Sequence, residues 1–143
     1  MAKPMSGTYL LPMPCKTSSI CASGGNVQHN TGIVVEAILS MGERTHGRIV
    51  VMVTDYISYD EAAKIWGKVT GKTAFPIEIP ASVYGGMWGP FGDEMASQLV
   101  WGEEYDNWHK PAGSKLLTLE ELGIKDKMQR FEDGLTAVKS LLV

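Results

Sequence analysis

Apolar residues recur at the spacing of an amphipathic helix in two segments of the first half of the chain. The first predicted helix begins at Asn30 or Thr31, either of which can cap it, and stops at Gly42. The second opens with the Ser-x-x-Glu spacing of a capping box at 58–61 and stops at Gly71. The apolar positions that define the two helices are Val34, Ala37, Ile38 and Met41, and Ala62, Ile65, Trp66 and Val69.

The second half of the chain predicts two further helices and one isolated turn. A loop rich in glycine and aromatic residues is expected at 84–92, followed by a helix at about 93–106. A second capping box, at 118–121, opens a single turn that stops at Gly123. The last predicted helix spans about 127–142, where apolar residues again recur at helical spacing.

Three segments favour extended structure. Residues 48–53 form a nearly continuous apolar run, which is typical of a strand buried on both faces. Residues 9–14 and 73–80 each contain two prolines, which suit an edge strand or an extended segment. Helices that alternate with short strands predict an α/β (α+β) fold, a few-stranded sheet with packed helices. We expect a single domain over residues 1–143, with a flexible end at 1–8.

Composition and charge exclude several classes of function. A net charge of −3 gives no electrostatic footprint for nucleic acid or an anionic membrane. The clearest apolar stretch, Ile49–Val53, is far too short to span a bilayer. Cys15 and Cys21 have no partners at zinc-site spacing, and the N-terminus lacks the apolar core of a secretory signal. The chain is therefore expected to be a cytoplasmic, reduced protein without a metal.

The glycines Gly86, Gly89 and Gly92 are spaced much as in a dinucleotide-binding turn. Such a turn must leave a buried parallel strand so that the amides of the following helix face the pyrophosphate. Here Pro80 interrupts the preceding segment, which contains no aliphatic run. We therefore favour a loop over a nucleotide site.

His29 and Glu94 are the candidates for acid–base chemistry. His29 precedes a predicted helix N-terminus, where it either faces a pocket or makes a structural hydrogen bond. Glu94 follows Asp93 in an opening helical turn, where a carboxylate stabilises the helix dipole or acts as a base at the mouth of an aromatic pocket. The sequence contains no His-x-x-x-His pair and no Gly-x-Ser-x-Gly elbow, so metal-site and hydrolase interpretations lack support.

Aromatic and methionine side chains near these residues are suited to line an apolar pocket. Tyr56 follows the predicted strand at 48–53, and in open α/β sheets the loops after strand ends line the ligand crevice. Tyr84 begins the predicted loop at 84–92 and carries a hydroxyl that can donate a hydrogen bond. The expected apolar wall consists of Met87, Trp88, Phe91 and Trp101.

Several segments, taken in order, resemble the C-terminal half of NmrA-like proteins, which are atypical short-chain dehydrogenases/reductases common in fungi. The segments are 47–61, 66–72, Tyr9–Pro14, Asn30–Gly32, Trp88–Gly89 with Gly92, and Leu122–Ile124. The resemblance extends from about Tyr9 to the C-terminus. It implies that the N-terminal Rossmann half, which holds NAD(P) in this family, is missing, and that no cofactor is bound.

The resemblance also implies that the strand at 48–53 lacks the strands that would flank it. An unpaired buried-type strand leaves backbone amides and apolar faces exposed, which is costly. Pairing with a second copy of the chain removes this cost, and two-fold homodimers are the commonest solution. We therefore expect an obligate homodimer.

NmrA-like proteins of fungi are often tailoring enzymes of secondary metabolism. The resemblance thus implies a cofactor-independent cyclase, isomerase or dehydratase acting on a large apolar metabolite such as a polyketide or terpenoid. His29 is the expected acid or base, Glu94 is its alternative, and Tyr84 or Tyr56 would donate a hydrogen bond to a developing oxyanion. The alternatives are a non-catalytic small-molecule-binding or regulatory module, and an NAD(P)-dependent reductase.

Overall fold

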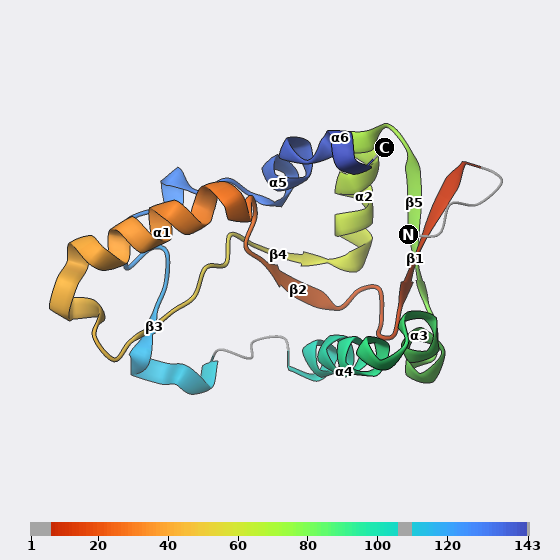
Figure 1. The fold of residues 1–143 in the computed structure, drawn as a ribbon, viewed down its shortest axis with the longest axis horizontal. Coiled ribbons are helices and arrows are strands. Elements are labelled where there is room, and N and C mark those ends of the chain that lie inside the picture. The colour runs from red at the N-terminus through yellow and green to blue at the C-terminus, as the bar shows by residue number, and fades with distance from the viewer. Residues whose placement is uncertain (1–6, 106–109, 143) are drawn as a thin grey trace. The chain divides into compact units, whose positions relative to one another are not determined.

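The computed structural model describes residues 7–105 and 110–142, and it is a mixed α/β protein as predicted (Figure 1). Most of the end predicted to be flexible, 1–8, lies outside the described residues. The chain divides into two compact units. The first comprises Met1–Cys21 and Ile57–Asn107, and the second comprises Ala22–Tyr56 and Trp108–Val143.

A parallel pair of strands organises the first unit. Strand β1 (Thr8–Met13) runs beside β5 (Thr73–Glu78), in a register that places Thr8 opposite Thr73 and Met13 opposite Glu78 (Figure 1). Parallel neighbours need a long crossover connection, which includes helix α2 (Tyr59–Thr70). Both proline-containing segments are extended, so this prediction is confirmed.

Helix α2 has the predicted boundaries. The Ser58 hydroxyl accepts a hydrogen bond from the Glu61 N–H, and the Glu61 carboxylate accepts one from the Ser58 N–H, which completes the capping box. Gly71 ends the helix in the left-handed region, at φ 72°. The Trp66 ring is buried and lies 5.0 Å, centroid to centroid, from Tyr9 on β1. The apolar face of α2 therefore packs on the strand pair.

The loop predicted at 84–92 is wrong, because this segment is helical. Helix α3 (Ala81–Trp88) is followed at once by α4 (Pro90–Glu104), and the two form a hairpin (Figure 1). Gly89, at φ 66°, separates them, and Pro90 starts α4 at a position where its missing N–H costs nothing. The high glycine content suggested a loop, but Gly85 and Gly92 are buried where the two helices touch.

Helix α1 (Val27–Met41) belongs to the second unit and begins earlier than predicted. Its N-cap is Asn26, whose side chain accepts a hydrogen bond from the His29 N–H. Asn30, one of the predicted caps, is instead inside the helix and fully buried. The helix is followed by Gly42 as predicted, and Gly42 opens a short 3-10 turn, η1 (Gly42–Thr45).

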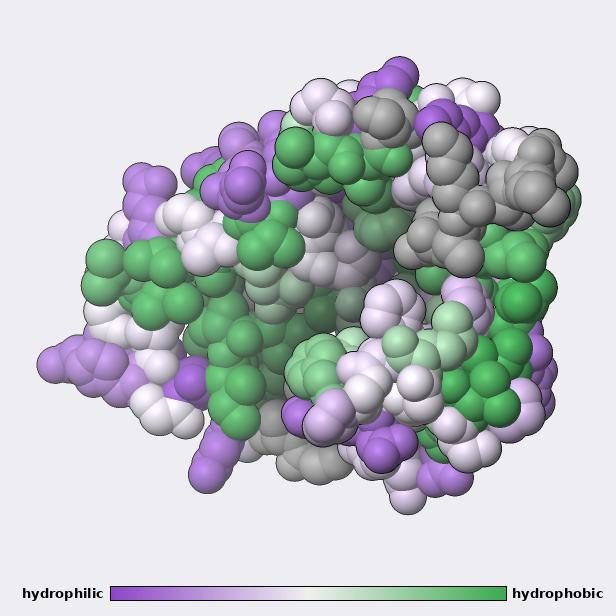
Figure 2. Space-filling view, turned by 45° about the vertical axis from the view of Figure 1, so that its right-hand side comes forward, coloured by the Kyte–Doolittle hydropathy of each residue, from purple (hydrophilic) through white to green (hydrophobic). Residues whose placement is uncertain are grey.

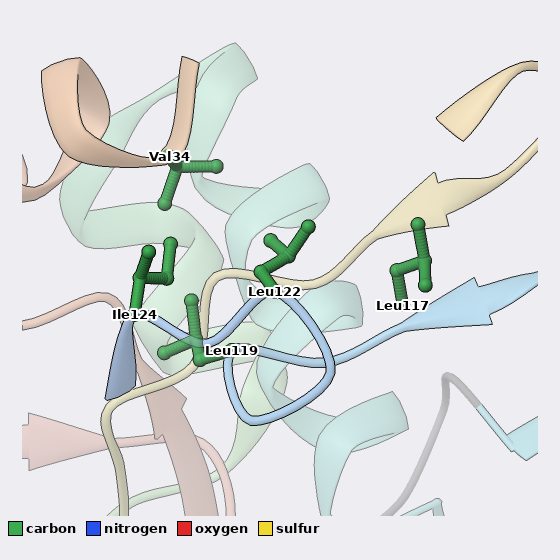
Figure 3. Close-up of a cluster of buried hydrophobic side chains, with 5 residues drawn as sticks. All are labelled: Val34, Leu117, Leu119, Leu122 and Ile124. Atoms are coloured by element: carbon green, nitrogen blue, oxygen red, sulfur yellow. The ribbon is translucent and has the colours of Figure 1, made fainter. Parts of the chain in front are cut away.

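The hydrophobic core of the second unit lies between α1 and the chain after residue 115. Strand β6 (Leu116–Leu117) and the turn that follows it supply most of the side chains, and α1 supplies one (Figure 3). The buried residues are Val34, Leu117, Leu119, Leu122 and Ile124. The capping box predicted at 118–121 is present, and it shapes the turn rather than a helix.

The predicted six-residue strand at 48–53 is mostly wrong. Only β3 (Ile49–Val50) is a strand, and it pairs in parallel with β6. Ile49 is 51 % exposed, so the strand is not buried on both faces. A third pair joins β2 (Ile20–Ser23) and β4 (Asp55–Ser58). Because β3 has a neighbour in the same chain, the argument for dimerisation from an unpaired strand no longer holds.

The last predicted helix begins four residues late and is broken. It is replaced by α5 (Phe131–Ala137) and α6 (Lys139–Leu142), after a 3-10 turn, η3 (Lys125–Lys127). Asp133 accepts a hydrogen bond from the Arg130 N–H and so fixes the start of α5. One more 3-10 segment, η2 (Lys110–Lys115), precedes β6.

Candidate functional site: a cleft between helices α3 and α4

A cleft of about 450 Å³ lies in the first unit between the start of α3 and one side of α4. This volume falls in the range of small-molecule sites, about 300–1,000 Å³. Ala81 and Ser82 contribute from α3. The residues from α4 are Asp93, Ala96, Ser97, Val100, Trp101 and Glu104. Their spacing of three and four residues places them on a single face of the helix.

Asp93 lies at the N-terminal end of this face, where α4 approaches α3. The carboxylate is close enough to Gly85 that a β-carbon at that position would collide with Asp93 Oδ1. Asp93 is also the acidic residue of the first turn of α4, where a negative charge is favoured by the helix dipole. The Ser97 hydroxyl donates to the Asp93 backbone carbonyl at 2.8 Å, so Ser97 is held against the helix.

Trp101 lines the opposite end of the cleft, and Tyr105 stacks against it. The rings of Trp101 and Tyr105 are stacked, with centroids 5.1 Å apart and planes inclined by 30°. Trp101 is 46 % exposed, so a face of the indole is open to a ligand although the ring is held in place. Glu104 lines the same end of the cleft.

Glu103, the residue before Glu104, holds the C-terminal end of α4 against the segment that follows β1. Glu103 Oε2 accepts a hydrogen bond from the Lys16 N–H, and its Oε1 lies 2.8 Å from Lys16 Nζ. The hydrogen bonds from Lys16 lower the pKa of Glu103, with a smaller contribution from the charge of the ammonium. This double contact fixes the C-terminal part of α4, and with it Trp101.

Glu94, predicted as a candidate base, does not line the cleft. Its carboxylate accepts a hydrogen bond from Gln98 Nε2 at 3.3 Å, one turn further along α4. The acidic residues at the cleft are its neighbour Asp93 and the more distant Glu104. The sequence contained the signal for both, because Asp93 and Glu104 lie eight residues before and three residues after Trp101, at helical spacing.

The other predicted pocket residues of this hairpin are brought together on α3 and at the start of α4, outside the cleft lining. The Tyr84 and Trp88 rings are in contact, with centroids 6.3 Å apart. Met87, Trp88 and Phe91 are between 49 % and 61 % exposed. Hydrophobic residues do reach the surface of the molecule, as Figure 2 shows. Of the predicted apolar wall, only Trp101 lines the cleft.

His29 and Tyr56 belong to the second unit. The His29 side chain is exposed at the first turn of α1, where its backbone N–H donates a hydrogen bond to Asn26 Oδ1. Tyr56 is 50 % exposed on β4, and burial together with the charge of Glu120 raises the pKa of its hydroxyl. The predicted catalytic residues are thus divided between two units.

Cys15 and Cys21 are free thiols of the first unit. Burial, reinforced by the charges of Glu103 and Glu78, raises the pKa of Cys15 to about 11. Burial also raises the pKa of Cys21. Since the thiolate is the nucleophile, neither group is activated for covalent chemistry at neutral pH. Among the described residues, no group of three His, Cys, Asp or Glu side chains is placed to hold a metal ion.

Comparison with known families now adds to this geometry. Residues 1–134 match the NmrA-like family. The chain belongs to this family. The match confirms that the resemblance to the NmrA-like family is correct. No protein with a curated description is significantly similar to this NmrA-like chain.

The glycines of this NmrA-like chain that resemble a dinucleotide-binding turn have another role. Gly86 lies within α3, Gly89 separates the two helices and Gly92 lies in α4, so the motif follows a helix and not a strand. A β-carbon on Gly92 would collide with the backbone carbonyl of Gly85. Of the three glycines, Gly92 therefore serves the close packing of α3 on α4, whereas Gly86 has open space around it. Within the described ranges, no helix has the length and apolar character needed to cross a membrane.

Proposed function

We propose that this NmrA-like chain is a cofactor-independent tailoring enzyme of the cyclase, isomerase or dehydratase type. Its substrate is a large apolar secondary metabolite, such as a polyketide or terpenoid. The observation that supports the proposal is the α3–α4 cleft, which combines an apolar wall with carboxylates and hydroxyls at its edges. This combination is typical of sites that orient an apolar ligand through a few polar groups.

In this proposal, the cleft folds the substrate against Val100 and Trp101, and Asp93 moves the proton. Holding a flexible substrate in a reactive conformation removes much of the entropic cost of a cyclisation or elimination. A carboxylate within hydrogen-bond reach of the substrate can take a proton from one carbon or oxygen and return it to another. The Ser82 hydroxyl lies at the same cleft and supplies a donor to a developing oxyanion.

Asp93 takes the place of Glu94 in this proposal because Asp93 lines the cleft and Glu94 does not. His29, Tyr84 and Tyr56 keep the roles predicted for them only as hypotheses, since none of the three lines the cleft. Asp93→Asn removes the proposed base with little change in shape. Glu94→Gln makes the same change in charge one residue away, and so it is the matched control.

The test is turnover in the absence of nucleotide. Candidate polyketide and terpenoid intermediates are incubated with the purified protein, and products are followed by liquid chromatography with mass spectrometry. We expect conversion by the wild type and by Glu94→Gln, and a loss of at least about 100-fold in Asp93→Asn. Conversion that depends on Glu94 or His29 and not on Asp93 would refute this assignment. Conversion only after addition of NADPH would instead support a reductase.

A non-catalytic binding module is the second candidate function, and the exposure of the cleft favours it. The Asp93 and Glu104 side chains are both solvent-exposed, so water is not excluded from the carboxylates. Enzymes of the proposed type usually shield the reacting groups. Saturable binding of an intermediate without product would support the binding module.

The predicted homodimer is a separate proposal. Its remaining support is the exposed apolar side chains, which include Phe75 on β5 and Leu39 on α1. Size-exclusion chromatography with light scattering should give about twice the mass of 15.6 kDa. A folded monomer at micromolar concentration would reject it.

A further inference from the structure

We propose that the ligand of the α3–α4 cleft carries a protonated amine, held by Glu104 and the exposed face of Trp101. The inference rests on the proposed function, because it concerns the same cleft. It adds a chemical class: an elongated apolar body with an ammonium group at one end.

The helix pair α3–α4 carries a net negative charge. The sequence from 81 to 105 contains four carboxylates and no Lys, Arg or His. Two of these carboxylates have partners, because Glu103 is paired with Lys16 and Glu94 with Gln98. Among the side chains that the structure describes, those of residues 7–105 and 113–142, neither the Asp93 nor the Glu104 carboxylate has a hydrogen-bond or ion-pair partner. These two are the carboxylates that line the cleft.

The position of Glu104 makes its negative charge unfavourable. Glu104 is the last residue of α4, and a negative charge at a helix C-terminus opposes the helix dipole. Glu103 also lies in this last turn, but Lys16 compensates its charge. The charge of Glu104 is therefore unfavourable for the helix and has no cation beside it among the described residues. A ligand ammonium would supply that cation.

An aromatic surface, the Trp101 ring, lies beside Glu104. Trp101 precedes Glu104 by three residues, so the two side chains are neighbours on the helix. An indole is the aromatic ring that attracts cations most strongly through its face. Stacking on Tyr105 holds the ring while leaving it 46 % exposed. The ring and the carboxylate can therefore act on one ammonium group without a change in the helix.

The length of the cleft separates the two carboxylates that line it. Asp93 and Glu104 are separated by eleven residues, which corresponds to about 16 Å along the helix axis. An ammonium held at Glu104 therefore leaves the far end of an elongated ligand beside Asp93. Glu104 then positions the substrate while Asp93 carries out the proton transfer. Ala96 and Val100 lie between them and contact the apolar body.

The test uses three probes of matched shape: 2-(2-naphthyl)ethylamine, 2-(2-naphthyl)ethanol and 3-(2-naphthyl)propionate. Their dissociation constants for the full chain are measured by isothermal titration calorimetry at neutral pH. We expect the amine to bind about tenfold more tightly than the alcohol, and the carboxylate most weakly. Equal binding of the amine and the alcohol would overturn the proposal.

Three variants assign the preference to its residue. Glu104→Gln should remove the preference for the amine, and the loss of a charge that opposes the dipole should not destabilise α4. Glu94→Gln, on the same helix and outside the cleft, should keep the preference. Asp93→Asn should keep most of it, because the ammonium is at the other end of the cleft. An equal loss in Glu94→Gln and Glu104→Gln would overturn the proposal by showing an effect of net charge alone.

These binding measurements need no turnover, so they separate the two proposals. An amine preference that depends on Glu104, without conversion of any intermediate, would refute the enzyme and leave the ligand class standing. Conversion of a neutral intermediate, in a protein without amine preference, would refute the ligand class and leave the enzyme standing.

Discussion

Asp55 Oδ1 accepts a hydrogen bond from Arg130 Nε at 2.6 Å, across 75 residues of sequence. The second oxygen, Oδ2, accepts hydrogen bonds from the Phe131 N–H at 2.9 Å and from the Thr54 hydroxyl at 2.8 Å. Asp55 is 6 % exposed. Because Phe131 is the first residue of α5, one buried carboxylate fastens the start of α5 to the start of β4.

Asp55→Ala should lower the free energy of unfolding by about 2–4 kcal/mol, because it leaves the partly buried Phe131 N–H without its acceptor and the Thr54 hydroxyl with only the Ser23 carbonyl. Arg130→Ala should cost only about 1 kcal/mol, since 72 % of the Arg130 side chain is exposed to water. Urea unfolding followed by circular dichroism measures both values. Equal losses in the two variants would contradict this view of the contact.

The same carboxylate makes stability depend on pH. Burial alone would raise the pKa of Asp55, but the hydrogen bonds from Phe131, Thr54 and Arg130 outweigh burial, so the pKa is lowered. A lowered pKa stabilises the folded state fully above the unfolded-state value of about 3.9, and this contribution is lost as the pH falls through the lower folded-state pKa.

The difference in unfolding free energy between wild type and Asp55→Asn should therefore be constant between about pH 5 and pH 7 and shrink below about pH 4. Urea unfolding of both proteins at a series of pH values measures it. A difference that grows as the pH falls would show that the sign is wrong.

The parts of the fold that the sequence predicted well are those controlled by local chemistry. The capping box at Ser58 and Glu61 and the left-handed Gly71 fix the ends of α2 through neighbouring residues alone. The start of α1 was missed because Asn26 and Asn30 are both possible caps in sequence. Asn30 is excluded from that role by its contacts with Gln129, 99 residues away, which no local pattern contains.

The sequence predicted only part of the candidate site, because most of the site depends on contacts between residues that no local pattern contains. Trp101 was identified from its residue type. Its partners in the cleft depend on α3 and α4 being a helical hairpin, whereas the glycines suggested a loop. Positions 85 and 92 require glycine because the two helices touch there, and that contact exists only in the folded chain. Once the hairpin is known, the spacing of Asp93 and Glu104 from Trp101 gives the cleft face.

The helical hairpin predicts opposite effects for two glycines that are six residues apart. A β-carbon on Gly92 would collide with the Gly85 backbone carbonyl, so Gly92→Ala should cost about 1–3 kcal/mol and distort the cleft. Gly86 lies in α3 with open space around it, so Gly86→Ala should stabilise the protein by about 0.5–1 kcal/mol. Thermal and urea unfolding compare the two, and a stabilising Gly92→Ala would argue against close helix contact.

Asn30 joins α1 to the chain before α5, and its removal should be the most damaging change in the second unit. Its amide nitrogen donates to the carbonyls of Gly24 at 2.8 Å and Gln129 at 2.7 Å, and its oxygen accepts from the Gln129 N–H at 2.9 Å. The side chain has no exposure to water, so Asn30→Ala leaves the Gly24 carbonyl and the Gln129 N–H without these partners and the Gln129 carbonyl with only the Asn26 N–H, at a cost of about 3–5 kcal/mol.

Asn26→Ala is the matched control, because Asn26 also bonds to Gln129, through the Gln129 side chain, but is only partly buried. It should cost about 1 kcal/mol, the usual value for an N-cap. Asn30→Asp keeps the shape of the side chain and removes its two N–H donors. It keeps the acceptor for Gln129 N–H and turns the two donor contacts into carboxylate–carbonyl repulsion, so it should destabilise as much as alanine does. Urea unfolding measures all three, and an Asn30→Asp variant as stable as wild type would show that the two donor contacts contribute nothing.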